Sequence, residues 1–358
     1  MYEINARTTE RAFIRKIAKA GSYKTANGRA NFYVDHTGQL LLIKTEKSVR
    51  PLSITRTKLR AAINYTYYVR TVTRKDLEAY SKLSSALLGI LIEVFQRIAK
   101  LHKTASGLLR LTIIGVRYFF AGADRAVRDL EVAAANGAKF VLMSYYHIRD
   151  RKAWRGHVER LGLKILLDSG AFTCWQAAEE GRKVKPVVLE EYADFIRHHR
   201  PVLYVLYAWF NLDVIGNAVA SKKNAEYMKA QGLAPIEVWH PQSGYEALDA
   251  LVAEDHAIIA IGGTAKLSEK ARLEVFTEIF KRHPGQNYHG LGLSSKLLFE
   301  FPWFTADSTG WLIGRKYGAI INPQGQRPAP EIGGLEALAY NVKQMAALEI
   351  TEAESLAA

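Results

Sequence analysis

Cysteine is nearly absent from this chain of 358 residues, in which Cys174 is the one thiol. A single thiol excludes an internal disulfide and a zinc site built from several thiolates, and it is typical of a reducing compartment. Long apolar runs are missing too, because the most apolar stretch, 85–95, is short and contains Glu93, whereas a membrane span needs about eighteen apolar residues or more. The first residues, MYEINARTTERAF, lack the features of a secretory signal. We therefore expect a cytoplasmic protein without a membrane segment.

Acidic residues are scarce in the first 110 residues, which hold 21 Lys and Arg against 7 Asp and Glu. The other 248 residues hold 28 of each, so the net charge of +14 lies entirely in the N-terminal segment. A localised basic excess is typical of a surface that binds phosphates, because each neutralised phosphate releases counterions. We expect Arg56, Lys58 and Arg60 to share a short helix and to contact a nucleic acid. A basic face that is merely solvated is the alternative.

Two patterns of hydrophobic periodicity divide the chain. Apolar residues from Leu77 to Leu101 recur at helical spacing and predict a long amphipathic helix that ends near residues 104–107. This stop predicts a basic N-terminal α+β domain over residues 1–107. From Leu111 onward, short apolar runs alternate with helical segments, which is typical of a parallel α/β fold. The expected strands are 112–120, 139–145, 164–167, 203–209, 236–239, 257–261, 288–293 and 303–306.

Eight strand-then-helix units favour a closed (β/α)8 barrel of the TIM type over residues 108–345, followed by a C-terminal tail over 346–358. An open doubly wound sheet is the alternative that the pattern leaves open. In a barrel of this type the active site lies where the strands end, so polar residues directly after the expected strands are candidate site residues.

Three aspartates follow expected strands in this way: Asp168, Asp213 and Asp307. Each one alone is equally well explained as a helix cap or a turn residue. Three carboxylates that converge on one edge repel each other, and packing does not require them, which favours a functional role. The pair Gly262 and Gly263 follows another strand, but no Walker or dinucleotide-binding glycine pattern surrounds it. We therefore expect no redox or metal cofactor.

Several segments resemble the tRNA-guanine transglycosylases. The segment DSGAFT (168–173) is similar to their DSGG-aromatic-Gln signature, and AIGGTAKLSE (260–269) is similar to their AIGGLAVGE segment. The segment YHGLGLSSKLLFEFPWFTADSTGW (288–311) resembles their YLMGVG segment and the nucleophilic aspartate that follows one helix later. The order and spacing of the segments agree with the family, over about residues 118–316. The N-terminal segment falls outside this resemblance.

The resemblance implies a role for each matching residue. Asp307 would be the nucleophile at the anomeric carbon, and Asp168 the proton-transfer group. Phe172 would stack on the bound base, and Asp213 would receive the donors on the Watson–Crick edge of guanine. In VWHPQSG (238–244), His240 or Gln242 would replace the family's amide contact to the base. The backbone amides of Gly262 and Gly263 would bind the exocyclic oxygen of the base.

Two family features are missing: the cysteine cluster with its histidine that binds zinc, and the Pro-Thr-Arg segment after the nucleophile. These departures resemble the phage and bacterial branch that inserts 7-deazaguanines into DNA. The sequence therefore predicts an enzyme that exchanges guanine in a polynucleotide, DNA in preference to tRNA, for a free 7-deazaguanine base through a covalent glycosyl-aspartate. The alternatives are a glycosylase that removes a base with water, and a non-catalytic paralogue that only binds nucleic acid.

Overall fold

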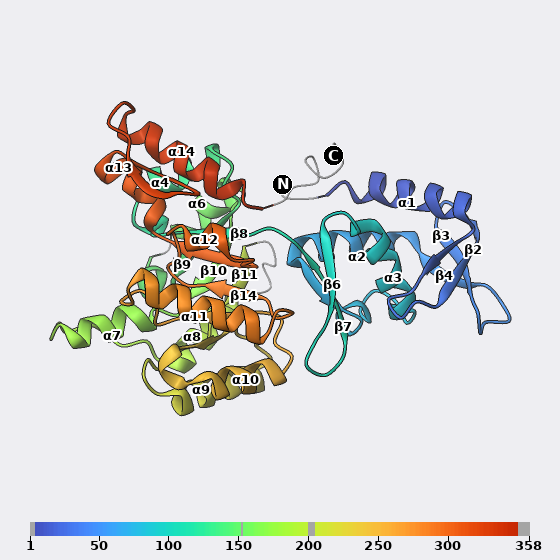
Figure 1. Cartoon of the computed structure of the whole chain (residues 1–358), viewed down its shortest axis with the longest axis horizontal. Coiled ribbons are helices and arrows are strands. Elements are labelled where there is room, and N and C mark those ends of the chain that lie inside the picture. Colours follow the sequence, from blue (N-terminus) through green and yellow to red (C-terminus); the bar gives the residue numbers. More distant parts are fainter. Residues whose placement is uncertain (1–3, 152, 200–204, 350–358) are drawn as a thin grey trace. The chain divides into compact units, whose positions relative to one another are not determined.

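A computed structural model describes residues 4–151, 153–199 and 205–349 of the chain (Figure 1). These residues form two compact units, and the chain passes from the first to the second between Ile114 and Gly115. The elements of the first unit are α1 Ala6–Ala20, β1 Ser22–Lys24, β2 Ala30–His36, β3 Leu40–Thr45, β4 Leu52–Thr55, α2 Arg56–Val69, β5 Thr71–Thr73, η1 Lys75–Leu77, α3 Ser84–Phe95, β6 Ala99–Lys103 and β7 Leu109–Ile113.

The first unit contains two antiparallel sheets, one with the order β1-β2-β3-β4 and one with the order β5-β7-β6. Helices α1, α2 and α3 bury their apolar faces in one hydrophobic core, to which Ile14, Leu59 and Leu87 contribute. The expected short basic helix is confirmed, and it extends to Val69 as α2.

The long helix expected between Leu77 and Leu101 is wrong. Residues of this segment form the short helix η1, the helix α3 and the strand β6. The Asp76 carboxylate accepts hydrogen bonds from the Thr73 amide (2.7 Å) and hydroxyl (2.8 Å), which fixes a separate turn before α3. β6 pairs with β7, and this tertiary contact overrides the local helical pattern. The expected helix stop at 104–107 is the turn of this hairpin.

The single strand expected over residues 112–120 is also wrong, because it is two strands that belong to different units. β7 ends at Ile113, and β8 begins at Arg117. Gly115 lies between them with a φ of 90°, in the left-handed region that glycine adopts without strain.

The second unit is built from alternating strands and helices. Its elements are β8 Arg117–Ala121, η2 Ala123–Arg125, α4 Val127–Ala135, β9 Phe140–Ser144, α5 Tyr145–Ile148, α6 Trp154–Arg160, β10 Lys164–Asp168, α7 Ala171–Glu179, α8 Leu189–His199, β11 Leu206–Trp209, α9 Ala218–Ala230, β12 Glu237–Trp239, η3 Pro241–Ser243, α10 Tyr245–Ala253, β13 Ile259–Ile261, α11 Glu269–Arg282, β14 Tyr288–Gly290, α12 Leu297–Glu300, β15 Thr305–Ser308, η4 Gly310–Leu312, α13 Ile313–Tyr317, β16 Ala319–Asn322, β17 Gly325–Pro328 and α14 Gly334–Ala346. The helix α11 begins at the expected cap, since the Ser268 side chain accepts from the Ala271 amide at 3.2 Å.

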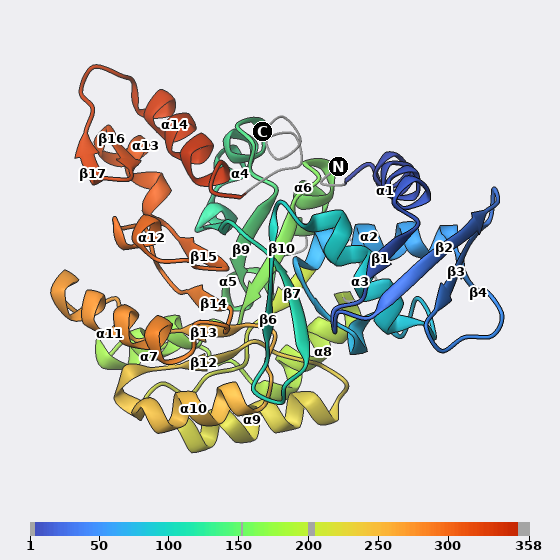
Figure 2. The same cartoon turned by 45° about the vertical axis from the view of Figure 1, so that its right-hand side comes forward.

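Eight parallel strands form one curled sheet with the order β11-β10-β9-β8-β15-β14-β13-β12, and helices such as α9, α10 and α11 flank it (Figure 2). The expected α/β fold with eight parallel strands is confirmed. The strands β11 and β12 lie at the two ends of this order. Phe210, just after β11, forms a parallel bridge with Ile236, just before β12. Residues 203–204 of the expected fourth strand lie outside the described residues.

Alternate strand residues meet across the curled sheet. The ring of Phe119 on β8 lies 5.5 Å from Tyr207 on β11 and 6.2 Å from His289 on β14. These strands are not neighbours in the sheet, so the contacts fill its interior. The interior is therefore a packed aromatic layer, and polar side chains follow it toward the carboxyl ends of the strands.

A buried ion pair joins the start of β8 to the end of the described chain. Arg117 is fully buried, and its Nε and Nη2 donate to Glu349 Oε1 at 2.9 and 2.7 Å. Its guanidinium also lies 4.0 Å from the centre of the Phe140 ring. Of the tail expected over 346–358, residues 346–349 thus belong to the second unit, and the rest lie outside the described residues. None of the helices in the described part is long and apolar enough to cross a bilayer.

The basic residues expected to bind nucleic acid on α2 have unequal surroundings. Arg56 Nε and Nη2 donate to the two carboxylate oxygens of Glu10 at 2.8 and 3.2 Å, and the Arg60 guanidinium lies 3.3 Å from the same group. Glu10 is fully buried. Arg56 and Arg60 therefore neutralise a buried carboxylate, which gives them a structural role, and their contact with phosphates stays a prediction. Lys58 is exposed and stays a candidate contact.

We expect Arg56→Ala to lower the free energy of unfolding by about 3 kcal/mol, because it leaves the buried Glu10 carboxylate with one partner fewer. Lys58→Ala, on the same helix, is the matched control and is expected to change it by less than about 0.5 kcal/mol. Urea denaturation of the two variants measures the difference. Similar losses in both would contradict a structural role for Arg56.

Candidate active site

Asp307 lies on β15, and defined donors hold one of its carboxylate oxygens. Asp307 Oδ1 accepts from the Gly292 amide at 3.2 Å and lies 3.1 Å from His289 Nε2. The other ring nitrogen of the fully buried His289 lies 2.8 Å from the Thr305 hydroxyl. If Thr305 donates to Nδ1, then Nε2 carries the proton that His289 donates to Asp307. Among the described residues no hydrogen bond reaches Oδ2 of this buried side chain.

Asp168 is the last residue of β10 and begins the DSG turn. Its Oδ2 accepts from the Gly170 amide at 2.9 Å. Gly170 has a φ of 91°, and a Cβ there would lie 2.4 Å from the Cβ of Tyr146, so both the conformation and the space require glycine. The turn therefore fixes the direction of the Asp168 carboxyl group.

The carboxyl groups of Asp168 and Asp307, here called the carboxyl pair, influence each other. Asp168 is partly exposed, yet it lies deep enough that burial raises its pKa from 3.8 to about 6, and the negative charge of Asp307 adds to this increase. A carboxyl group with this pKa exchanges its proton near neutral pH, as a general acid or base must. The structure thus brings together the two residues expected to be catalytic.

A third carboxyl group, Asp124 on η2, was not predicted. Burial raises its pKa, and the charge of the nearby His147 opposes this shift. The charge of Asp124 also contributes to the raised pKa of Asp168. Asp124 Oδ2 is buried, and no hydrogen-bond partner for it occurs among the described residues. The signal was present in the sequence, because FFAGAD places this aspartate just after a strand, as in the case of Asp168.

Asp213 follows β11, and both of its carboxylate oxygens have partners within the protein. The Ser221 hydroxyl donates to Oδ1 at 2.7 Å, and His240 Nε2 lies 2.5 Å from Oδ2. Asp213 and His240 line a cavity of about 260 Å³ that extends between α9 and α10. Asp213 therefore binds His240 and Ser221 within the protein. A hydrogen bond from a base would have to use the remaining lone pairs of this carboxylate.

The glycine pair after β13 packs against the side chains that follow β12. A Cβ at Gly262 would lie 2.9 Å from His240 Cε1, and one at Gly263 would lie 2.8 Å from His240 Nδ1 and 3.0 Å from Gln242 Oε1. The Gly262 amide donates to the Trp239 carbonyl at 2.8 Å within the sheet. This bond corrects the expectation that Gly262 offers its amide to a base and leaves that role to Gly263.

Phe172 on α7 is 49% exposed, which is unusual for a large apolar side chain. Its ring centre lies 5.8 Å from that of Trp175, and the ammonium of Lys266 lies 4.4 Å from the Trp175 ring centre. Since Lys266 follows the glycine pair, this cation–π contact brings α7 to the carboxyl end of β13. The exposed ring is free to stack on a planar ligand.

Glu237, Glu254 and His256 are the group among the described residues whose donor atoms lie close enough to hold a metal ion. Lys229 Nζ lies 2.5 Å from Glu237 and 3.3 Å from Glu254, and Lys222 also pairs with Glu254. Two ammonium groups therefore already neutralise the two carboxylates. The group is an ion-pair network, since a metal ion would have to displace the lysines.

Comparison with known proteins identifies no family for the chain, because no family model and no curated protein matches it. Among solved structures, the open form of tryptophan synthase from M. tuberculosis with BRD0059 bound is 11% identical, with a TM-score of 0.38 over 66% of this chain and 93% of that chain. A protein assigned as a mandelate racemase from Bordetella bronchiseptica RB50, complexed with 2-oxoglutarate/phosphate, is also 11% identical, with a TM-score of 0.35 over 80% of this chain and 85% of that chain. Similarity of this degree identifies neither a reaction nor a substrate.

We expect Asp168→Asn to be more stable than the wild type above about pH 6 and to converge with it below about pH 4. The folded protein holds the Asp168 proton up to about pH 6, whereas the unfolded chain releases it near 3.8, so wild-type stability falls across this window as pH rises, by up to about 3 kcal/mol. Denaturant unfolding at several pH values measures the difference. Asp150→Asn, at an exposed carboxylate, is the control, and an equal response of both variants would contradict the assignment.

Proposed function

We propose that the chain is a transglycosylase that exchanges guanine in a polynucleotide for a 7-deazaguanine, with the second unit as a (β/α)8 barrel. The carboxyl pair carries this proposal: Asp307 offers an unoccupied oxygen, and Asp168 has a pKa of about 6. A nucleophilic carboxylate beside a carboxylic acid is the arrangement that retaining glycosyl transfer uses. The resemblance of DSGAFT and the segments that follow it supplies the class of base.

In the first step Asp307 Oδ2 attacks the anomeric carbon of the nucleotide. The carbon–oxygen bond to Asp307 forms as the bond to guanine breaks, and Asp168 gives its proton to the departing base. In the second step the ring nitrogen of the 7-deazaguanine attacks the same carbon and passes its proton to Asp168, and the Asp307 carboxylate is released. Two inversions retain the configuration, and both side chains return to their starting states.

The base would bind between the aromatic side chain of Phe172 and the polar residues after β11, β12 and β13. Phe172 offers a ring for stacking, Gly263 an amide for the exocyclic oxygen, and Gln242 both a donor and an acceptor. Asp213 would act on the base through the hydrogen bond that orients His240. This arrangement modifies the role that the family resemblance gives to Asp213.

The polymer would be DNA in preference to tRNA, because the chain lacks the zinc ligands of the tRNA enzymes. The target nucleotide must leave its stack to reach the ends of the strands. The excess of basic residues in the first 110 residues is suited to hold the flanking phosphates. No redox or metal chemistry is part of the proposed reaction.

We expect Asp307→Asn to abolish the exchange of labelled guanine in DNA while the protein stays folded and binds the polymer, because an amide cannot form the covalent intermediate. Release of labelled guanine from DNA and from tRNA, with free 7-deazaguanine present, is measured in parallel. Turnover above about one hundredth of wild type would exclude Asp307 as the nucleophile. Guanine release without incorporation of the deazaguanine would identify a base-removing glycosylase instead, and binding without either would identify a non-catalytic protein.

We expect His289→Leu to lower kcat about a hundredfold with little change in KM, because His289 orients Asp307 without touching the substrate. His289→Gln, which can keep an N–H donor toward Asp307, is expected to retain more of the activity. A merely structural role would instead give variants that lose activity in proportion to their loss of stability, which denaturant unfolding of both proteins reveals.

A further inference from the structure

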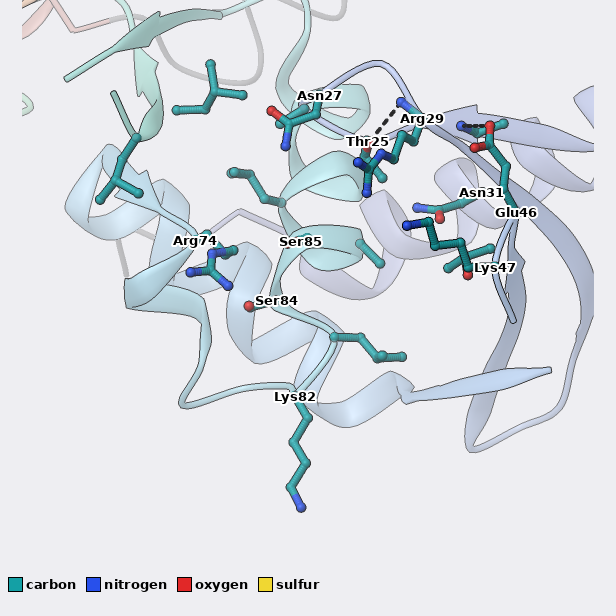
Figure 3. A pocket seen from close by; sticks show the side chains of 18 of the residues that line it. Thr25, Asn27, Arg29, Asn31, Glu46, Lys47, Arg74, Lys82, Ser84 and Ser85 are labelled. Carbon is teal, nitrogen blue, oxygen red and sulfur yellow. Dashed lines mark hydrogen bonds between the residues drawn. The ribbon is translucent and has the colours of Figure 1, made fainter. Parts of the chain in front are cut away.

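A cavity within the first unit contains neither residue of the carboxyl pair in its lining and has no part in the proposed chemistry. Its volume is about 420 Å³, which is in the usual range for small-molecule sites. It lies between the turns that follow β1 and β3 and the beginning of α3 (Figure 3). All of its lining residues belong to the first unit.

Basic residues outnumber acidic ones in the lining of this cavity, here called the phosphate cavity. Arg29 and Lys47 lie on one side of the start of α3, and Arg74 lies on the other (Figure 3). The one acidic residue in the lining is Glu46, whose carboxylate accepts the Ala30 amide at 3.1 Å. The lining therefore carries an excess of positive charge that favours an anion.

The first turn of α3 adds the positive end of a helix to the same cavity. The residue before the helix, Leu83, has no side chain that can cap it, and the first turn contains no acidic residue. Ser84 and Ser85 of this turn line the cavity. A helix of 12 residues with an uncapped N-terminus directs its first amides and its dipole toward an anion.

Asn31 independently indicates a missing acceptor. The residue is 1% exposed and lines the cavity. The Tyr23 hydroxyl, which donates to the Ala86 carbonyl at 3.4 Å, is close enough to interact with the Asn31 side chain, but Nδ2 makes no hydrogen bond of good geometry among the described residues. In Figure 3 its side chain lies beside Arg29 and Lys47. A buried donor without a partner costs about 1–3 kcal/mol, which an anionic acceptor in the cavity would relieve.

We propose that the phosphate cavity binds the phosphate group of a nucleotide, with Arg29, Lys47 and the first turn of α3 as its contacts and Asn31 as an additional donor. Apolar residues such as Leu88 and Leu109 in the same lining provide a surface for the sugar or base. Within the proposed function, the nucleotide belongs to the polynucleotide substrate. The binding itself requires only the first unit's own residues.

The test measures the affinity of the full chain for a short fluorescein-labelled single-stranded DNA over a range of salt concentrations. Arg29→Gln and Lys47→Gln are each expected to weaken binding about tenfold and to lower the slope of log K against log salt by about 0.7. Lys82→Gln removes the same charge from a lining residue whose side chain points away from the others in Figure 3, and it is expected to change affinity less than about twofold. Asn31→Ala is expected to weaken binding several-fold, and circular dichroism verifies the fold of each variant.

Competition by dGMP that depends on Arg29 would support a nucleotide site, and equal competition by inorganic phosphate would support recognition of the phosphate group alone. Equal losses in Lys82→Gln and Arg29→Gln, or no loss in either, would overturn the proposal. Base exchange is measured in the same proteins. If the wild type exchanges bases but Arg29→Gln and Lys47→Gln bind DNA as tightly as it does, only the proposed cavity site is overturned. If the variants bind DNA as weakly as expected but the wild type exchanges no base, only the proposed function is overturned.

Discussion

Burial of the Asp168 carboxyl group near a second carboxyl group, that of Asp307, is the constraint on which the candidate active site depends. Burial and the charge of Asp307 raise the pKa of Asp168 to about 6, while the Gly292 amide donates to Asp307 Oδ1 and His289 Nε2 lies 3.1 Å from the same oxygen. The two groups are chemically alike, but their surroundings differ. In the proposed reaction Asp168 serves as the acid and Asp307 as the nucleophile, and burial of the Asp168 carboxyl group costs stability that the rest of the fold must provide.

The sheet provides that stability through its interior. Phe119 packs against Tyr207 and His289 from strands that are not its neighbours. Arg117 is buried against Phe140 and paired with Glu349. Because strand side chains alternate in direction, each inward residue lies at a defined height above this layer. His289 lies in the packed aromatic layer and contacts Asp307, so the Asp307 carboxylate is oriented by a residue that packing holds fixed.

Net charge alone does not say which cations are available to a partner. Arg56 and Arg60 are engaged by the buried Glu10, whereas Arg29 and Lys47 lie at a cavity that also holds a helix N-terminus and an unsatisfied donor. The first group stabilises the unit, and the second is suited to bind an anion. Asp213 likewise has partners within the protein, because both of its carboxylate oxygens contact Ser221 or His240.

Hydrophobic periodicity and strand ends are local signals, and they were enough to predict a parallel α/β fold with Asp168 and Asp307 at the ends of two of its strands. Contacts between residues distant in the sequence account for what these signals missed. The end of the expected helix, from Ala99, forms the strand β6 because β7 offers hydrogen-bond partners. Arg56 pairs with Glu10 because this buried carboxylate, distant in sequence, requires a counter-charge. The raised pKa of Asp168 likewise depends on burial and on Asp307, and both exist only once the strands have come together.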